Sequence, residues 1–265
     1  MSTTATETTT AAGETAAEGG AAHGEKIIDP IHQFFITPLF GDGPLGTFTF
    51  TNSSLWAVIA VICASALFLL APTSLVPTRL QSIAESIYEV VDNMTHEVLH
   101  DNARRYFPFV LTLFTFILFC NVLGLIPYSF TVTSHIIVTL ALALVVFVGA
   151  TLIGFIRNGF GYLKLFVPSG VPAVLLPLVV VIEIVSYFIR PLSLSIRLFA
   201  NMMAGHMMLK VMAGFVVMLG VAAGWLPLAA MVGLMGLELL VAALQAYVFA
   251  LLTCMYLNDA MHVDH

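Results

Sequence analysis

The sequence predicts an all-α integral membrane protein with about five transmembrane helices and an interfacial amphipathic helix, the last two spans being long, tilted and antiparallel. The composition is the first observation: 60% of the 265 residues are hydrophobic, 9% are charged, and the mean hydropathy is +1.01. A soluble domain of ordinary composition is far less apolar. The second observation is a series of uncharged runs long enough to cross a bilayer. The third is a final apolar stretch that is too long to stand upright in one.

The N-terminal part of the chain differs in character from the rest. Residues 1–25 are rich in Ala, Thr, Gly and Glu and contain no large apolar residue after Met1. Such a segment buries too little surface to offset the entropy lost on ordering, so we expect a disordered acidic tail. It has neither the basic start nor the apolar core of a secretory signal. Residues 26–52 are predicted to be an interfacial segment, and residues 53–265 form the membrane domain.

Three ordinary spans are predicted at residues 53–71, 106–127 and roughly 135–155. Between the first two, residues 78–105 place apolar side chains at spacings of three and four, with acidic side chains opposite. This pattern favours an amphipathic helix along the membrane surface. Basic residues occur in the loops after the first and third spans, and the other short connections have none. The positive-inside rule therefore places those basic loops and the C-terminus in the cytoplasm or the matrix, with the N-terminus outside.

The last part of the chain, residues 172–257, predicts a long helical hairpin. The 48 residues from 172 to 219 contain no loop-like segment, and as a helix they would measure about 72 Å against a hydrocarbon core of about 30 Å. We therefore expect a steeply tilted helix, kinked at Pro177 and Pro191. The stretch "VAAGWLP" at 221–227 supplies the turn, and residues 228–257 return antiparallel.

Ionisable and amide side chains form one stripe on the first helix of this hairpin. At 100° per residue, Glu183, Arg190, Arg197 and Asn201 lie within about 40° of one another. Arginine does not release its proton in proteins, so Arg197 is a fixed positive charge that repels protons and attracts carboxylates. Glu183 lies about 21 Å from Arg197 along the helix axis. The counter-ion of Arg197 is therefore expected on another protein.

The returning helix carries Glu238 and Gln245 on one face. In an antiparallel hairpin, residues at the same level have a constant sum of residue numbers, which places Gln245 near the level of Arg197 and Glu238 near the level of His206. A histidine beside a carboxylate can relay protons because either group can hold one near neutral pH. The sequence thus predicts a proton relay beside a fixed positive charge.

Two motifs in this hairpin resemble a known family. "RLFANMMAG" (197–205) has an Arg-Leu-x-x-Asn-x-x-x-Gly pattern, and "QAYVFALLT" (245–253) has a Gln-Ala-x-x-Phe-x-x-Leu-Thr pattern. The chain from about residue 30 onward is similar to the a subunits of F-type ATP synthases, the stator part of the proton channel. The resemblance implies no catalytic and no metal-binding residue. It implies that protons are translocated by Arg197, Glu183, Asn201, His206, Glu238 and Gln245. It implies that Arg197 faces the ring carboxylates, that His206 and Glu238 line the outer half-channel, and that Glu183 belongs to the inner one.

The resemblance also implies the function and the partners. We expect a non-catalytic transport subunit, without a cofactor, that couples proton flow through two offset half-channels to rotation and ATP synthesis. The expected partners are the c-subunit ring, the b/b′ peripheral stalk, the rest of the complex and the lipid bilayer, with no nucleic acid. The expected location is the bacterial inner (plasma) membrane, and the mitochondrial inner membrane is the alternative. A stand-alone proton-coupled secondary transporter is the rival function, although the sequence lacks the repeated halves typical of that class.

Several residues keep more than one interpretation. His96 and His100, four residues apart on one helix face, could ligate a metal, but a polar surface face is the simpler interpretation. Arg190 is either a channel residue or an anchor near the membrane surface, and we leave it outside the core site. Ser193 and Ser195 are candidates for the approach to the inner half-channel.

Overall fold

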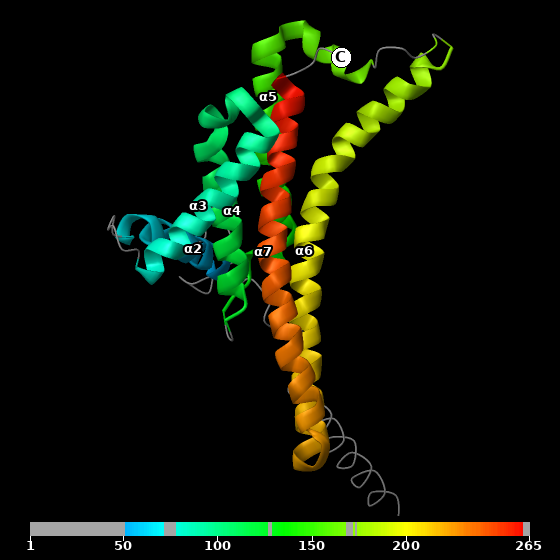
Figure 1. The fold of residues 1–265 in the computed structure, drawn as a ribbon. Helices are drawn as coiled ribbons and strands as arrows, with labels where there is room; N and C mark the ends of the chain where they lie inside the picture. Colours follow the sequence, from blue (N-terminus) through cyan, green and yellow to red (C-terminus); the bar gives the residue numbers. More distant parts are fainter. Residues whose placement is uncertain (1–50, 72–77, 127–128, 168–171, 173, 262–265) are drawn as a thin grey trace, which may run out of the picture. The chain divides into compact units, whose positions relative to one another are not determined.

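The computed structural model describes residues 51–71, 78–126, 129–167, 172 and 174–261. The predicted acidic tail and nearly all of the predicted interfacial segment lie outside these residues. The regular elements of the described part are helices (Figure 1). In chain order they are α2 (Asn52–Leu70), α3 (Arg79–Leu99), η2 (His100–Asn102), α4 (Ala103–Gly124), η3 (Val132–Ser134), α5 (Ile136–Asn158), η4 (Gly159–Phe166), α6 (Leu176–Ala223) and α7 (Trp225–Met261).

The prediction of an all-α protein with five spans is confirmed. Within the described residues, five helical segments are long and apolar enough to cross a membrane. Helices α2 and α5 lie close to the predicted first and third spans. The fourth and fifth spans are formed by α6, with 48 residues, and α7, with 37 residues. Both exceed the length of about 20 residues that a perpendicular crossing requires.

Short polar residues and glycine set the helix ends. At the start of α2, the Thr51 N–H donates to Ser54 Oγ at 2.9 Å and the Ser54 N–H donates to Thr51 Oγ1 at 3.4 Å. This reciprocal capping box satisfies backbone donors that the first helical turn leaves open. Helix α3 begins in a similar way, where the Gln81 N–H donates to Thr78 Oγ1. Helix α5 ends at Gly159, whose φ of 53° is readily adopted only by glycine.

The predicted amphipathic helix over 78–105 is too long. Helix α3 ends at Leu99, because His100 has φ 46° and turns the chain out of the helical path. An L-residue at positive φ cannot continue a right-handed helix. Residues 103–105 instead form the first turn of α4, which packs against α3 (Figure 1). The position of α3 along the membrane surface stays a prediction.

By their contacts, the described residues divide into two units, a larger one formed by 51–203 with 237–261 and a smaller one formed by 204–236. The larger unit contains a continuous apolar core to which α3, α4, α5, α6 and α7 all contribute. Among its largest fully buried side chains are Leu99, Ile117, Leu198, Phe249 and Leu257. Helix α6 contributes Leu194 and Leu198 to this core, and the core residues of α7 lie between Ala246 and Met261. The core therefore fixes the parts of both helices next to Arg197 and Gln245.

The described part of the smaller unit is the tip of the hairpin, 204–236, and here the predicted turn needs correction. The helical path breaks at Gly220, with φ 58°, and the Gly224 N–H donates to Gly220 O at 2.9 Å. A Cβ at Gly224 would lie 2.4 Å from Gly220 O, so the turn tolerates no side chain there. Helix α7 begins at Trp225 rather than at 228. Pro227 is accommodated because the first helical turn does not need its N–H.

Candidate functional site

Helix α6 turns Arg197 away from the core. Leu194, Leu198 and Met202 recur at a spacing of four and are buried, whereas Arg197 is exposed. Within the part of the chain that the structure describes, Arg197 makes no hydrogen bond and no ion pair. Ser195 is fully buried and shares a 3.1 Å hydrogen bond with Thr139 of α5, so it contributes to packing. The described chain thus offers a permanent positive charge on an otherwise apolar helical surface.

The two amides predicted to accompany Arg197 lie in different environments. Asn201 is half-buried one turn beyond Arg197, and Gln245 is buried on α7 beside the fully buried Ala242 and Ala246. Among the described residues, no hydrogen bond joins Arg197, Asn201 and Gln245 to one another. Their predicted action together therefore stays a prediction.

His206 and Glu238 are both buried, each with 6% of its surface exposed. Burial of two ionisable side chains in an apolar chain is costly unless each has polar partners. His206 belongs to the hairpin-tip unit and Glu238 to the larger unit. Their predicted pairing as a proton relay stays a prediction.

A buried amide of α4 holds α7 between Glu238 and Gln245. Asn121 has no exposed surface; its Nδ2 donates to Ala242 O at 3.1 Å, and its Oδ1 accepts from Thr133 Oγ1 at 2.9 Å. Ala242 lies one turn after Glu238 and three residues before Gln245. The two hydrogen bonds of Asn121 fix the rotation of the part of α7 that carries both predicted site residues.

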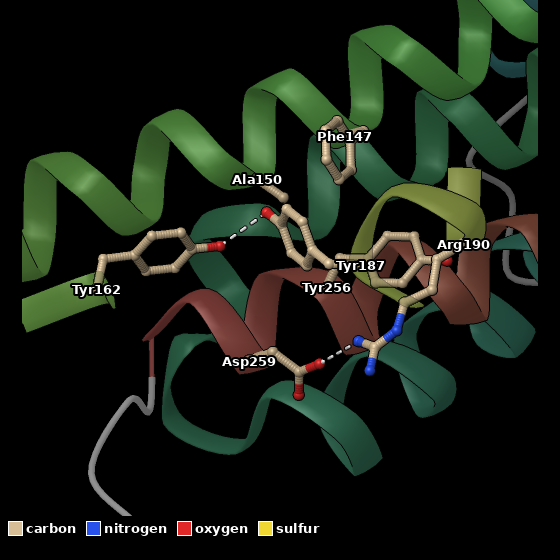
Figure 2. A pocket seen from close by; sticks show the side chains of 7 residues that line it. All are labelled: Phe147, Ala150, Tyr162, Tyr187, Arg190, Tyr256 and Asp259. Atoms are coloured by element: carbon tan, nitrogen blue, oxygen red, sulfur yellow. Dashed lines mark hydrogen bonds and ion pairs between the residues drawn. The ribbon is translucent and has the colours of Figure 1, made fainter. Parts of the chain in front are cut away.

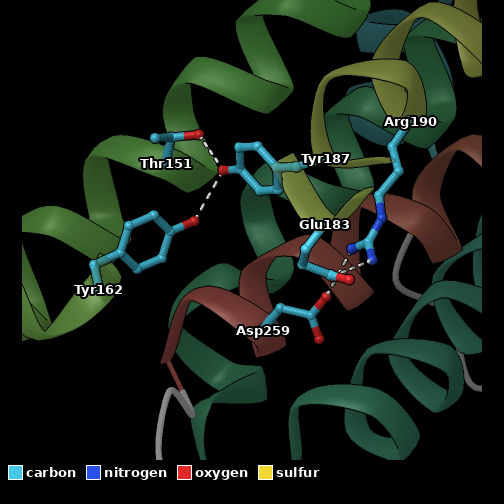
Figure 3. Close-up of polar contacts among 6 residues, drawn as sticks. All are labelled: Thr151, Tyr162, Glu183, Tyr187, Arg190 and Asp259. Atoms are coloured by element: carbon cyan, nitrogen blue, oxygen red, sulfur yellow. Dashed lines mark hydrogen bonds and ion pairs between the residues drawn. The ribbon is translucent and has the colours of Figure 1, made fainter. Parts of the chain in front are cut away.

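The structure joins Glu183 to two ionisable residues outside the predicted site. The guanidinium of Arg190 has Nη2 3.7 Å from Glu183 Oε1, and its Nη1 donates to Asp259 Oδ2 at 3.3 Å (Figure 3). Glu183 and Arg190 are seven residues apart on one face of α6, and Asp259 lies near the end of α7. All three side chains are about two-fifths exposed. We refer to Arg190, Glu183 and Asp259 as the inner triad.

Sequence reasoning missed the part played by Arg190 and Asp259. Its own helical count had already placed Arg190 on the stripe of Glu183, and that spacing was a usable signal for an ion pair. Asp259 sits in the stretch "YLNDA" at the polar end of α7, where an acid has a simple explanation as a solvated residue. Because 69 residues separate it from Arg190, only the pairing of α6 with α7 reveals the contact.

A chain of hydroxyl groups borders the inner triad. Tyr187 of α6 lies 2.6 Å from Thr151 Oγ1 of α5 and 2.9 Å from the Tyr162 hydroxyl of η4 (Figure 3). Thr151 Oγ1 donates its proton to Phe147 O at 2.7 Å, so it must accept from Tyr187. Tyr187 in turn accepts from Tyr162. The chain therefore runs in one direction and ends at a backbone carbonyl, which anchors η4 and α5 to α6.

Substitution of Gly154 by alanine is expected to dislodge this anchor. A Cβ at Gly154 would lie 2.3 Å from Cε2 of Tyr162, whose ring is almost completely buried. The ring must move, so the Tyr162–Tyr187 hydrogen bond is lost and the free energy of unfolding falls by about 1–3 kcal/mol. The measurement is thermal unfolding of the purified protein in detergent. Gly149→Ala, in the same helix with no atom within 4 Å of the new Cβ, is the matched control and should leave stability unchanged or raise it.

Metal ligation finds no support from clustering: the described residues contain no group of three or more His, Cys, Asp or Glu side chains placed to hold an ion. His96 Nε2 lies 3.6 Å from Asp92 Oδ1 on the same exposed helix. This contact is an ordinary pair between neighbouring turns. It accords with the interpretation of His96 as part of a polar surface face.

Five helical segments are long and apolar enough to cross a membrane, and α6 and α7 carry ionisable side chains well inside their length, a combination typical of polytopic membrane proteins that move ions. The ATP synthase A chain family matches residues 53–258. The chain is 55% identical over 241 residues to the ATP synthase subunit a of Pelagibacter ubique, covering 89% of this chain and 99% of that protein. The subunit a of Chelativorans sp. is 57% identical over 246 residues, covering 89% and 99%, and that of Parvibaculum lavamentivorans is 55% identical over 249 residues, covering 90% and 95%.

The chain belongs to the ATP synthase A chain family. Membership supports roles in ATP synthesis and proton transport, and association with the rest of an ATP synthase complex. The apolar helices and the bacterial relatives support a bacterial membrane as its location.

Proposed function

We propose that this chain is the non-catalytic proton-path stator of a rotary F-type ATP synthase in the bacterial inner membrane. Arg197 faces a rotating ring of c subunits and meets each ring carboxylate in turn. Protons reach the ring from outside through an outer half-channel containing His206 and Glu238. They leave to the inside near Glu183. Asn201 and Gln245 orient the groups around Arg197.

The guanidinium of Arg197, which is exposed and has no ion pair among the described residues, is the observation that carries this proposal. A permanent charge on an apolar helix is unfavourable in a bilayer unless another group compensates it. The described part of the chain supplies no such group, whereas a carboxylate on a neighbouring protein would. A passing carboxylate would lose its proton beside Arg197, and Arg197 would block free protons from crossing between the half-channels. Each charge that crosses gains about 2.3 kcal/mol per 100 mV of membrane potential.

The distribution of the other ionisable groups supports two separate half-channels. Glu183 belongs to the inner triad, which is partly exposed, whereas His206 and Glu238 are buried. Glu183 and Arg197 are 14 residues apart on α6, which corresponds to about 21 Å of helix rise. In this proposal the rotating ring carries the bound proton from the outer half-channel to the exit near Glu183. The proton therefore does not move through this chain past Arg197.

Purification from native membranes in mild detergent tests the proposal against a stand-alone transporter. A stator should be isolated together with a ring of small subunits and with peripheral-stalk subunits of the b/b′ type. Mass spectrometry of the isolated assembly identifies them. Isolation of the chain alone, still able to carry protons after reconstitution into vesicles, would support the secondary transporter instead.

A further inference from the structure

The inner triad contains one cation for two acids. The two carboxylates come from different helices, α6 and α7, and meet at opposite nitrogens of the Arg190 guanidinium (Figure 3). With all three groups ionised, the triad carries one net negative charge. Protonation of either carboxylate leaves the other paired with Arg190, so the triad can accept one proton without losing its link between the helices.

The described cavity and hydroxyl chain beside the triad do not offer another route for that proton. The adjoining cavity, of about 10 Å³, is lined by Phe147, Ala150, Tyr162, Tyr187, Arg190, Tyr256 and Asp259 (Figure 2). That is about the space of one water molecule. The hydroxyl chain through Tyr187 ends at Phe147 O and cannot pass a proton onward. A proton on the triad therefore leaves through the exposed side of its carboxylates.

Other titratable or charged groups near the triad are few. On α6, Tyr187 lies between Glu183 and Arg190, and Arg197 follows two turns later. On α7, Tyr256 is within electrostatic range of Arg190, Arg197 and Asp259, and on η4 Tyr162 is within range of Asp259. The tyrosines are neutral near pH 7. Arg190 is the cation that contacts both acids.

We propose that Arg190 promotes the release of protons from Glu183 and Asp259 in the inner half-channel, an inference that rests on the proposed exit of protons near Glu183. A proton delivered to Glu183 or Asp259 forms an O–H bond and cancels that carboxylate's attraction to the guanidinium. The guanidinium favours the return of the anion, so the O–H bond breaks and the proton passes to water on the inner side. Arg190 keeps its own protons throughout. It acts through the acids and is therefore a positioning residue.

Without the cation, the same two carboxylates would retain the proton. Two carboxylates that share a site cannot both ionise freely, because each disfavours the charge of the other. One of them would then hold its proton more tightly, and release of that proton would become slower. Since the side chains are about two-fifths exposed, solvent weakens the effect, and we expect a shift of about one pH unit in the release midpoint.

The test is passive proton flow through the complete membrane part of the complex in inverted vesicles stripped of the catalytic head. The inner side of the membrane then faces the bath. A potassium gradient with valinomycin makes the lumen positive and drives protons into the bath, and the rate is recorded as a function of bath pH. Arg190→Gln should lower the rate of proton flow about tenfold at pH 7, since one pKa unit corresponds to a tenfold change in equilibrium. The rate should recover at higher bath pH.

Matched variants separate charge from structure. Arg190→Lys keeps the cation and should keep the midpoint within about half a unit, because lysine also carries a positive charge near pH 7. Arg190→Gln with Glu183→Gln leaves a single acid and should restore the midpoint toward that of the original protein. If Arg190→Gln does not assemble, Asp259→Asn gives Glu183 sole use of the guanidinium and should move the midpoint to lower pH.

The outcomes distinguish this inference from the proposed function. The role of Arg190 would be overturned if Arg190→Gln left the midpoint unchanged or lowered the flow equally at every pH. In that case Glu183→Gln would still slow the flow if the proposed inner exit is correct. Unchanged flow in the double variant Glu183→Gln, Asp259→Asn would overturn both this inference and the inner exit near Glu183. A midpoint that moves up in Arg190→Gln and down in Asp259→Asn supports the inference.

Discussion

Replacement of Arg197 by alanine is expected to abolish ATP synthesis driven by a proton gradient. Among the exposed residues of α6 that the structure describes, only Arg197 carries a permanent charge without a counter-ion in the described chain. Under the proposed function, its loss would leave a ring carboxylate with nothing to favour loss of its proton, and would remove the barrier to free protons. Reconstituted vesicles containing the whole complex should show at least about a hundredfold lower synthesis, the size of effect that removal of one preorganised charge produces.

The control for this prediction is another exposed arginine. Arg104, in the first turn of α4, is exposed and makes no ion pair within the described chain. Arg104→Ala should leave ATP synthesis within about twofold of the original, because exposed charges outside such sites contribute little. ATP hydrolysis by the catalytic head shows whether each complex has assembled. Arg197→Ala complexes that still synthesised ATP at full rate would refute the assignment of this residue.

Much of the fold could be predicted because bilayer thickness limits the choices. An uncharged run such as that of α2 can satisfy its backbone only as a helix, so its bounds followed from composition alone. The excess length of α6 also followed from counting residues. The ends were harder, because they depend on single backbone conformations. The positive φ of His100 and the break at Gly220, four residues before Gly224, are choices that hydropathy does not encode.

The candidate site was predictable only where its residues share a helix. Helical periodicity placed Glu183, Arg190 and Arg197 on one stripe, and the structure joins the first two in an ion pair. Contacts between helices required the packing itself. Asn121 reaches Ala242 across 121 residues, and Asp259 reaches Arg190 across 69. An asparagine inside an apolar run is visible in sequence, but its partner is not.

Substitution of Asn121 by leucine is expected to lower the thermal stability of the complex and its rate of proton transport together. The larger apolar side chain removes both hydrogen bonds at a site with no exposed surface. Thr133 Oγ1 loses its acceptor and Ala242 O loses its donor from α4, at a cost of about 1–3 kcal/mol for a buried group left unsatisfied. Because Ala242 lies between Glu238 and Gln245, rotation of α7 by even a small angle would displace both proposed channel residues. Thermal unfolding in detergent and ATP-driven proton pumping in vesicles measure the two effects.

Addition of Thr133→Val to Asn121→Leu separates the hydrogen bonds from simple packing. Removal of both polar partners leaves no unsatisfied hydroxyl, so the double variant should be more stable than Asn121→Leu alone, by about 1 kcal/mol. Asn158→Ala removes a different side-chain hydrogen bond to α7, in which the half-buried Asn158 Nδ2 donates to Ala260 O at 2.8 Å. It should cost less than Asn121→Leu and should impair pumping less, since it leaves the Asn121–Ala242 hydrogen bond near Glu238 in place. If Asn158→Ala impaired pumping as severely as Asn121→Leu, attachment of α7 in general, rather than its rotation near Glu238, would explain both results.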